Sequence, residues 1–171
     1  LATARQVATD EARALDALAE SFDHRFAEAV QMILDATGRV IVSGIGKSGH
    51  IGHKIAATLA STGTPAYFVH PAEASHGDLG MITPEDLCIL ISNSGETSEL
   101  GDMVAHVARF SIPMIGISKN PDSTLMKAAD MRLILPNEPE ACIIGMAPTT
   151  STTLTLAMGD ALAIALMKYR D

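Results

Sequence analysis

The ten residues from Val40 to Gly49, VIVSGIGKSG, constrain the fold more than any other stretch of this chain. A short β-branched, apolar run that ends at glycine is typical of a buried parallel strand. Apolar residues at helical spacing follow at Ile51, Ile55 and Leu59. The stretch therefore predicts a strand, a glycine-rich loop and a helix. The first N–H groups of that helix would converge on one point, which suits an anion.

The same alternation of strand and helix recurs along the chain. Further apolar runs that predict strands lie at residues 65–69, 86–91, 113–118 and 131–135, with helical patterns between them. This order predicts an α/β fold with a doubly wound, mainly parallel, five-stranded sheet flanked by helices. We expect a single domain over residues 1–171, with N-terminal helices in residues 1–37 and the α/β core in residues 38–171.

The ends of several elements can also be predicted. A helix is expected over residues 3–18, and Ser21 is expected to cap a second helix that ends at Gly38. Residues 70–81 are expected to be irregular, and the last helix is expected to begin near Pro148. Ligands of such folds bind beyond the carboxyl ends of the strands, so the loops after the first, third and fifth strands are the candidate sites.

Composition narrows the class of protein. The net charge of −8 argues against a nucleic-acid partner. Cys88 and Cys142 lie in apolar settings without the spacing of metal ligands, which predicts buried free thiols in a reducing cytoplasm. The apolar stretch 152–167 is interrupted by Asp160 and is expected to be a buried helix rather than a membrane span. The chain starts with Leu1 and shows no signal peptide, so we expect a piece of a longer cytoplasmic protein.

The first loop holds Gly46, Lys47 and Ser48, and it can be compared with two known phosphate-binding patterns. A Walker-type loop would need glycine at position 41, which is isoleucine here. The dinucleotide fingerprint GxGxxG is formally present, but the next strand lacks an acidic residue at its tip. The loop therefore favours a phosphorylated small molecule over NAD, while its glycines could equally serve helix packing alone.

The second loop, Ser92–Thr97, follows a buried strand and precedes a helix. It places several hydroxyl groups and backbone N–H groups together, which is the chemistry of a phosphate cradle without lysine. The alternative is ordinary helix capping by Ser94 or Thr97. One hydroxyl would suffice for capping, so the pattern favours a ligand.

Two carboxylates and two histidines are candidates for proton transfer. Glu99 is expected in the first turn of a helix, where the helix dipole alone could explain it. Glu140 precedes an apolar, small-residue segment, which predicts a raised pKa and a role as proton carrier. His70 and His76 flank the stretch expected to be irregular. No third ligand stands at a recognisable spacing, so a catalytic metal is not expected.

Four segments resemble one known family. GIGKSG, ISNSGETSE, HGDLGM and APTTSTTLTLAMGDALA are similar to the sugar isomerase (SIS) domain, and more narrowly to bacterial arabinose 5-phosphate isomerases. The resemblance implies a flavodoxin-like three-layer sandwich and the interconversion of D-ribulose 5-phosphate and D-arabinose 5-phosphate through a cis-enediol(ate). It also implies a cytoplasmic homotetramer, a role in Kdo and lipopolysaccharide synthesis, and a pair of CBS domains in many members.

The resemblance also assigns roles to residues. The positions that match the family's catalytic residues are Lys47, Glu99 and Glu140. The positions that it places at the phosphosugar are Gly46, Ser48, Gly63, Thr64, His76, Ser92, Ser94 and Thr97. No cofactor is implied, and His70 matches a residue associated with zinc, which acts as an inhibitor.

One departure and two alternatives remain open at this stage. The family continues to a Ser-His-Pro-Gly-Gly segment with a catalytic histidine, and this chain stops at Asp171 before it. We therefore expect that the chain could bind substrate without turning it over. The alternatives are a non-catalytic sensor of sugar phosphates and an isomerase of another sugar phosphate. No membrane or nucleic-acid partner is expected.

Overall fold

The computed structural model describes residues 1–170, and its five strands form one parallel sheet. The strands are β1 (Val40–Gly44), β2 (Ala66–Phe68), β3 (Leu87–Ile91), β4 (Met114–Ser118) and β5 (Met131–Ile134). Their order across the sheet is β2-β1-β3-β4-β5, and every pair of neighbours is parallel. This confirms the predicted doubly wound sheet.

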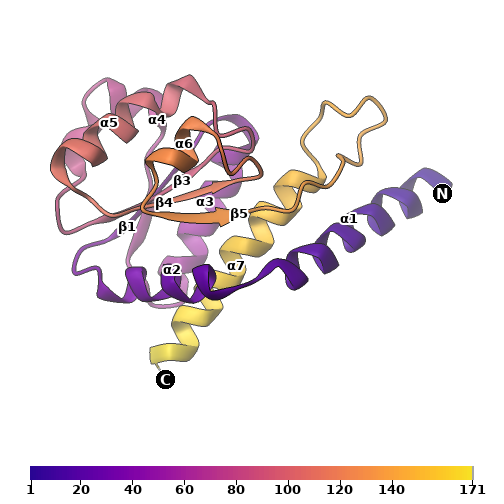
Figure 1. The fold of residues 1–171 in the computed structure, drawn as a ribbon, viewed down its shortest axis with the longest axis horizontal. Coiled ribbons are helices and arrows are strands. Elements are labelled where there is room, and N and C mark those ends of the chain that lie inside the picture. Colours follow the sequence, from indigo (N-terminus) through magenta and orange to yellow (C-terminus); the bar gives the residue numbers. More distant parts are fainter. Residues whose placement is uncertain (171) are drawn as a thin grey trace.

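Helices cover both faces of the sheet, so the fold has three layers (Figure 1). The helices are α1 (Ala2–Ser21), α2 (His24–Asp35), α3 (Gly46–Ser61), α4 (Pro71–Ser75), α5 (Gly101–Phe110), α6 (Thr124–Ala128) and α7 (Thr150–Arg170), with 3₁₀ turns η1 (Asp78–Met81) and η2 (Ser98–Leu100). The side chains of each strand alternate between the two layers. Val40 and Val42 face α1, α2, α3 and α7, whereas Ile41 faces α4, α5 and α6.

The strand order creates the crevice that positions the site. The chain leaves β1 through α3 to reach β2 on one side, and it later returns to β3 on the other side of β1. The loops after β1 and β3 therefore diverge from the same edge, which is where α/β folds bind ligands. The long connection from β5 to α7 leaves the same edge and extends well beyond the sheet (Figure 1).

Several predicted ends differ from the structure. Ser21 is the last residue of α1 and its hydroxyl donates to the carbonyl of Leu18, so it does not cap α2. Asp23 caps α2 instead, because its carboxylate accepts from the N–H of Arg25. Residues 70–81 are not irregular, since α4 and η1 occupy most of them. Helix α7 begins at Thr150, two residues later than expected.

Helix α7 is longer than its apolar sequence stretch suggested. By length and composition alone it could cross a membrane, but half of its most apolar stretch is buried inside the domain. Leu154, Leu162 and Leu166 lie in the core with the strands of the sheet. The helix is therefore explained as the core helix of the layer that also contains α3.

The two cysteines lie in different environments. Cys88 is fully buried in β3, and this burial raises the pKa of its thiol to about 12. Cys142 is only half-buried in the loop before α7, so the prediction of a buried thiol is wrong for this residue. Both thiols are free, as the sequence predicted.

A buried carboxylate ties the amino ends of β1 and β3 together. Asp86 is 1% exposed and accepts hydrogen bonds from the backbone N–H of Arg39 (2.7 Å) and of Thr83 (2.8 Å). The guanidinium of Arg39 forms an ion pair with the same carboxylate at 3.3 Å. Burial by itself would raise the pKa of Asp86, but the hydrogen bonds from Thr83 and Arg39 outweigh it and lower the pKa.

Asp86→Asn is expected to reduce the free energy of unfolding at pH 7 by about 1–3 kcal/mol, because it removes the charge partner of Arg39. The folded-state pKa of Asp86 is lowered, so its contribution is complete above about pH 4 and is lost as pH falls through the folded-state pKa. The difference in stability between wild type and variant should thus be largest near neutral pH. Urea unfolding at pH 7 and in acid measures this difference.

The matched control is Asp35→Asn, whose carboxylate accepts from Gln31 on the exposed surface of α2. It should leave stability within about 0.5 kcal/mol of wild type at both pH values. A stability loss in Asp86→Asn that stays constant into acid would contradict the assignment.

Candidate functional site

The first loop turns from β1 into α3 through three closely spaced glycines. Gly46 has φ of 59°, a left-handed conformation that favours glycine. A Cβ on Gly49 would lie 2.7 Å from the carbonyl oxygen of Gly44. Backbone geometry therefore explains the glycine pattern that resembles a dinucleotide fingerprint, and β2 is followed by Val69 and His70 rather than by an acidic residue.

Lys47 stands in the first turn of α3, next to N–H groups that have no partner within the helix. Its side chain is exposed and takes part in none of the ion pairs found within residues 1–170. Ser48 is half-buried in the same turn. A mobile positive charge at a helix N-terminus is an arrangement that attracts an anion.

The hydroxyl groups of the second loop divide into inner and outer groups. Ser92 is 3% exposed, and its Oγ accepts from the N–H of Gly95 at 2.9 Å and lies 2.6 Å from Oγ1 of Thr97. Ser94 is exposed, and its Oγ accepts from the N–H of Glu96 at 3.2 Å. Ser92 therefore organises the loop from inside, while Ser94 and Thr97 are the hydroxyls that a ligand can reach.

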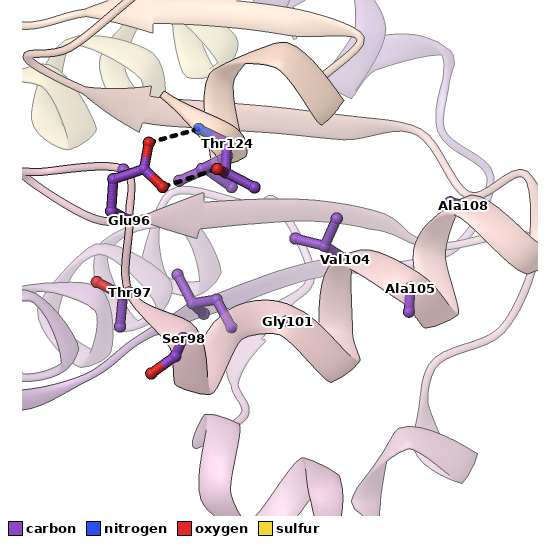
Figure 2. Close-up of a pocket in the computed structure, with 11 residues that line it drawn as sticks. Glu96, Thr97, Ser98, Gly101, Val104, Ala105, Ala108 and Thr124 are labelled. Carbon is purple, nitrogen blue, oxygen red and sulfur yellow. Dashed lines mark hydrogen bonds between the residues drawn. The ribbon is translucent and has the colours of Figure 1, made fainter. Parts of the chain in front are cut away.

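Contacts with α6 fix the same loop from behind. Gly95 has φ of 71°, and its carbonyl accepts from the N–H of Leu125 at 3.0 Å. The carboxylate of Glu96 accepts from the N–H of Thr124 at 2.9 Å and from its hydroxyl at 2.7 Å (Figure 2). The Thr124 hydroxyl is the main reason that the pKa of Glu96 is lowered. Sequence reasoning missed Glu96, because its partner lies 28 residues away.

A cavity of about 480 Å³ opens behind this loop, between α5 and α6. Figure 2 shows Val104, Ala105 and Ala108 along its α5 wall. The lining is mostly apolar, which does not suit a phosphosugar. We therefore place the candidate site at the carboxyl edge of the sheet, where the polar loops gather, and not in this cavity.

Glu140 lies in the loop after β5 and caps the N-terminus of α7. Its Oε2 accepts from the N–H of Thr149 (2.7 Å), the hydroxyl of Thr149 (3.2 Å) and the N–H of Ser151 (3.2 Å). Burial alone would raise the pKa of Glu140, but interactions with Ser151 and Thr149 outweigh burial and lower it. The predicted raised pKa is therefore wrong, since the helix start stabilises the charged form.

Glu99 lies in η2, the short turn between the second loop and α5, rather than in the first turn of a regular α-helix. Its carboxylate is exposed and accepts from the hydroxyl of Ser98 at 3.0 Å. The position immediately precedes the N-terminus of α5, so the helix dipole favours the negative charge there.

The two predicted histidines lie at the ends of α4. The Nδ1 atom of His70 accepts from the N–H of Ala72 at 3.2 Å, which caps the helix, and His76 follows its last turn. His70 also lines a small pocket of about 140 Å³ together with His50 and His53 of α3. Sequence reasoning missed these two histidines, although their spacing of three places them on one face beside the first loop. Within residues 1–170, no three histidine, cysteine or acidic side chains lie close enough to hold a metal.

Gly63 and Thr64 are not brought to the same edge as the other candidates. They follow α3 and precede β2, so they lie at the amino edge of the sheet. Thr64 is 3% exposed, and its hydroxyl accepts from Arg170. Contact of these two residues with a sugar at the carboxyl edge would require a second copy of the chain, and their substrate role stays a prediction.

The chain is similar in sequence to known proteins of one family. A family model described as the SIS domain matches residues 32–165. An arabinose 5-phosphate isomerase KdsD of Yersinia pestis is 55% identical over 97% of this chain, and one of Pseudomonas aeruginosa PAO1 is 52% identical over 92%. The chain spans about half the length of these relatives, 51% and 48% respectively.

The fold is also similar to that of a solved relative. A protein of Escherichia coli CFT073, solved in complex with arabinose 5-phosphate, superposes with a TM-score of 0.94. It is 38% identical, and the alignment covers 97% of this chain and 88% of that one.

Gly95→Ala is expected to destabilise the second loop by at least about 2 kcal/mol, or about 4–8 °C in Tm. A new Cβ would lie 1.9 Å from Oγ of Ser123, and φ of 71° would be strained for alanine. The double variant Gly95→Ala/Ser123→Gly relieves the collision and should recover part of the loss. Calorimetry of both variants measures the effect.

Gly101→Ala is the matched control, because a Cβ there meets nothing within 4 Å and its backbone is helical. It should leave Tm unchanged or slightly higher. A Gly95→Ala variant as stable as Gly101→Ala would contradict the loop geometry.

Proposed function

The chain belongs to the SIS domain family, and we propose that it is the isomerase domain of an enzyme that interconverts D-ribulose 5-phosphate and D-arabinose 5-phosphate. The observation that carries the proposal is Glu140, a carboxylate fixed by the start of α7 at the edge that also presents the Lys47 loop and the Ser92–Thr97 loop. The names of the curated relatives and the arabinose 5-phosphate complex of a structural neighbour support the substrate.

The reaction moves a proton between C1 and C2 of the sugar through a cis-enediol(ate). A carboxylate can serve as the base of such a step, as the glutamate of triosephosphate isomerase does. We assign this role to Glu140 and the stabilisation of the developing oxyanion to Lys47. Glu99 and His76 are assigned to proton transfers at the sugar oxygens and to ring opening. Both lie on exposed segments next to the edge.

The phosphate is assigned to the second loop. Ser94 and Thr97 offer hydroxyl donors, and the start of α5 lies directly behind them. Gly46 and Ser48 contribute backbone N–H groups and a hydroxyl from the first loop. Anchoring the phosphate lets its binding energy orient C1 and C2 against the base.

The fixed position of Glu140 supports its assignment as the base. Three hydrogen bonds hold its Oε2, which leaves Oε1 as the oxygen that can face the substrate. Since the pKa is lowered, the carboxylate is charged and ready to accept a proton at neutral pH. No charged side chain is among the causes of this pKa shift, so the helix start and its hydroxyls set it.

We propose that the reaction requires no cofactor, because it moves only protons and keeps the oxidation level of the whole molecule.

Zinc is proposed as an inhibitor that binds His70. His50 and His53 line the same small pocket, and Gly46 of the first loop lies on its wall. We propose that a cation at this position would repel the charge of Lys47, which follows Gly46 in the chain.

Oligomerisation and cellular role are proposed from the exposed surface and the relatives. Ile143, Ile144 and Met146 are 94%, 73% and 79% exposed in the loop that extends from the sheet. Helix α1 buries only Ala14 and Leu18 against the domain. Apolar surface of this kind is typical of contacts between subunits, and we propose a tetramer, in the cytoplasm, that serves Kdo and lipopolysaccharide synthesis.

A sensor of sugar phosphates and an isomerase of another sugar phosphate are the rival functions. Both would bind a phosphosugar through the same loops. A sensor has no need of a charged, positioned carboxylate at the carbon that reacts, and Glu140 therefore favours an enzyme. The length of the sugar is set by the depth of the pocket, which an exchange assay with several phosphosugars resolves.

Glu140→Gln is expected to abolish isomerisation and the exchange of the C2 proton, with a fall in rate of at least about 10³-fold, because the amide cannot accept the proton. The measurement is proton NMR of arabinose 5-phosphate in heavy water with the full-length protein. Deuterium entering C2 as ribulose 5-phosphate forms is the expected wild-type result.

Glu138→Gln, two residues earlier in the same loop, is the matched control and should retain exchange. Exchange at the wild-type rate in Glu140→Gln would remove Glu140 as the base. Binding of the sugar by wild type without any exchange would favour the sensor.

The tetramer is tested by light scattering at micromolar concentration. The expected mass for this chain is four times 17.9 kDa. Replacement of Ile143, Ile144 and Met146 by serine should reduce the mass, because it removes exposed apolar surface without touching the core. A wild-type mass of 17.9 kDa would contradict the proposal.

A further inference from the structure

The loop that carries Glu140 closes on itself through two consecutive threonines. The backbone N–H of Ala141 donates to Oγ1 of Thr149 at 3.0 Å and to Oγ1 of Thr150 at 3.1 Å. Residues 140–141 therefore lie against residues 149–151, and the intervening residues form the extended part of the loop. This contact places Glu140 over the first turn of α7.

The hydroxyl of Thr149 has a defined direction in this contact. One of its lone pairs accepts the N–H of Ala141, and Oε2 of Glu140 lies 3.2 Å from the same oxygen. A hydroxyl has a single proton, and a charged carboxylate can only accept. The proton of Thr149 must therefore point to Glu140.

We propose that Thr149 is the positioning residue of the base: its hydroxyl and backbone N–H hold Oε2 of Glu140, so that Oε1 faces the reacting carbon. The inference rests on the proposed function, in which Glu140 accepts the proton from the sugar. Thr149 contacts the carboxylate of Glu140, and in this proposal it acts through Glu140.

The role suits threonine better than the residues that resemble it. A β-branched side chain has few χ1 rotamers, so the hydroxyl is fixed where it is needed. Valine keeps the shape and loses the hydroxyl, whereas serine keeps the hydroxyl and loses the second branch. The backbone N–H of Thr149, at 2.7 Å from Oε2, persists in every variant. The side-chain contribution can therefore be isolated.

Ser151 also acts on the same carboxylate, and it stands first among the residues that lower the pKa of Glu140. It is 7% exposed, and its interaction with Glu140 helps to lower the pKa of that residue. Its Oγ nevertheless makes no hydrogen bond of normal geometry within residues 1–170. Thr149 has the defined hydrogen bond, and we assign the positioning role to it.

Two titratable groups lie within two residues of Glu140 in the sequence. They are Glu138 and Cys142, and the pKa of the Cys142 thiol is lowered by backbone N–H groups, that of Ala147 first. No charged group of α7 contributes to the pKa of Glu140. A change in the pKa of Glu140 after substitution of Thr149 can thus be attributed to the lost hydroxyl.

The test is the pH dependence of kcat/KM for the full-length protein with Thr149→Val, Thr149→Ser and Thr153→Val. Loss of the hydroxyl raises the pKa of the carboxylate, so the acid limb of Thr149→Val should move up by about one pH unit. The value of kcat should fall about tenfold while KM changes little, because the base is no longer held in place. In Thr149→Ser, the acid limb and kcat should both lie close to their wild-type values.

Thr153→Val is the matched control, since it removes a hydroxyl one turn further along α7. It should behave as wild type. A Thr149→Val variant whose acid limb and kcat match those of Thr153→Val overturns the inference. An activity loss with an unmoved acid limb also overturns it, because a purely structural role would produce that result.

A ¹³C NMR titration of the Glu140 carboxyl group separates this inference from the proposed function. The carboxyl should titrate at higher pH in Thr149→Val than in wild type, whether or not Glu140 is the base. Suppose that the pKa is raised in Thr149→Val but that Glu140→Gln retains full exchange. The contact between Thr149 and Glu140 would then be confirmed, and the role of Glu140 as the base would be refuted. If Thr149→Val does not fold, two other variants decide the question. The pKa of the Glu140 carboxyl group should be near the wild-type value in Thr149→Ser and above it in Thr149→Ala.

Discussion

Because all five strands run parallel, every loop that leaves a strand lies on one edge of the sheet, and every segment that enters a strand lies on the other. The two edges have separate tasks in this chain. The carboxyl edge carries Lys47, the Ser92–Thr97 loop and Glu140. The amino edge carries Asp86, whose buried carboxylate pairs with the partly exposed guanidinium of Arg39 and serves stability. We propose a catalytic carboxylate only at the carboxyl edge, whereas the carboxylate of Asp86 binds the backbone N–H groups of Arg39 and Thr83.

Helix N-termini at the carboxyl edge of the sheet attract negatively charged groups. The start of α7 is occupied by the chain's own Glu140, and the start of α6 is capped by Ser123 and bonded by Glu96. Within the described residues, the start of α3 has no side-chain capping bond, and neither does that of α5. The turn η2 precedes α5, and the N–H of Gly101 already donates to the carbonyl of Ser98. The first N–H groups of α3 therefore remain for an anion from outside.

The sequence analysis predicted the features that depend on local sequence pattern, above all the strands. The apolar runs identified all five strands to within a residue or so at each end, because continuous burial leaves an unmistakable run in a parallel sheet. Ser21 was misassigned because its hydroxyl donates back to the carbonyl of Leu18 in the last turn of α1, a contact that the local pattern does not show. The helix at Pro71–Ser75 was missed because five residues are too few to show a period.

Contacts between distant residues could not be predicted in the same way. The hydrogen bond from Thr124 to Glu96 and the capping of Thr149 by Glu140 both depend on where a loop folds back. The direction of the Glu140 pKa shift depends on the contact between its loop and the start of α7. An apolar neighbourhood predicts a raised pKa, whereas donors at a helix start lower it, and only the structure shows that the donors are there. The separation of Gly63 and Thr64 from the other candidates likewise became visible only with the strand order.

In the proposed reaction, the lowered pKa of Glu140 affects which residue must lower the barrier. A carboxylate that is charged at neutral pH is always ready, but it is a weak base, and it gives little driving force for removal of a proton from carbon. The barrier must then be lowered at the other end of the transferred charge, where the enediolate oxygen develops. Lys47, which forms no ion pair within residues 1–170 and lies at the start of α3, is the group placed to do this. In the proposed reaction, Glu140 therefore contributes a fixed position for the base, and Lys47 contributes the stabilisation of the developing charge.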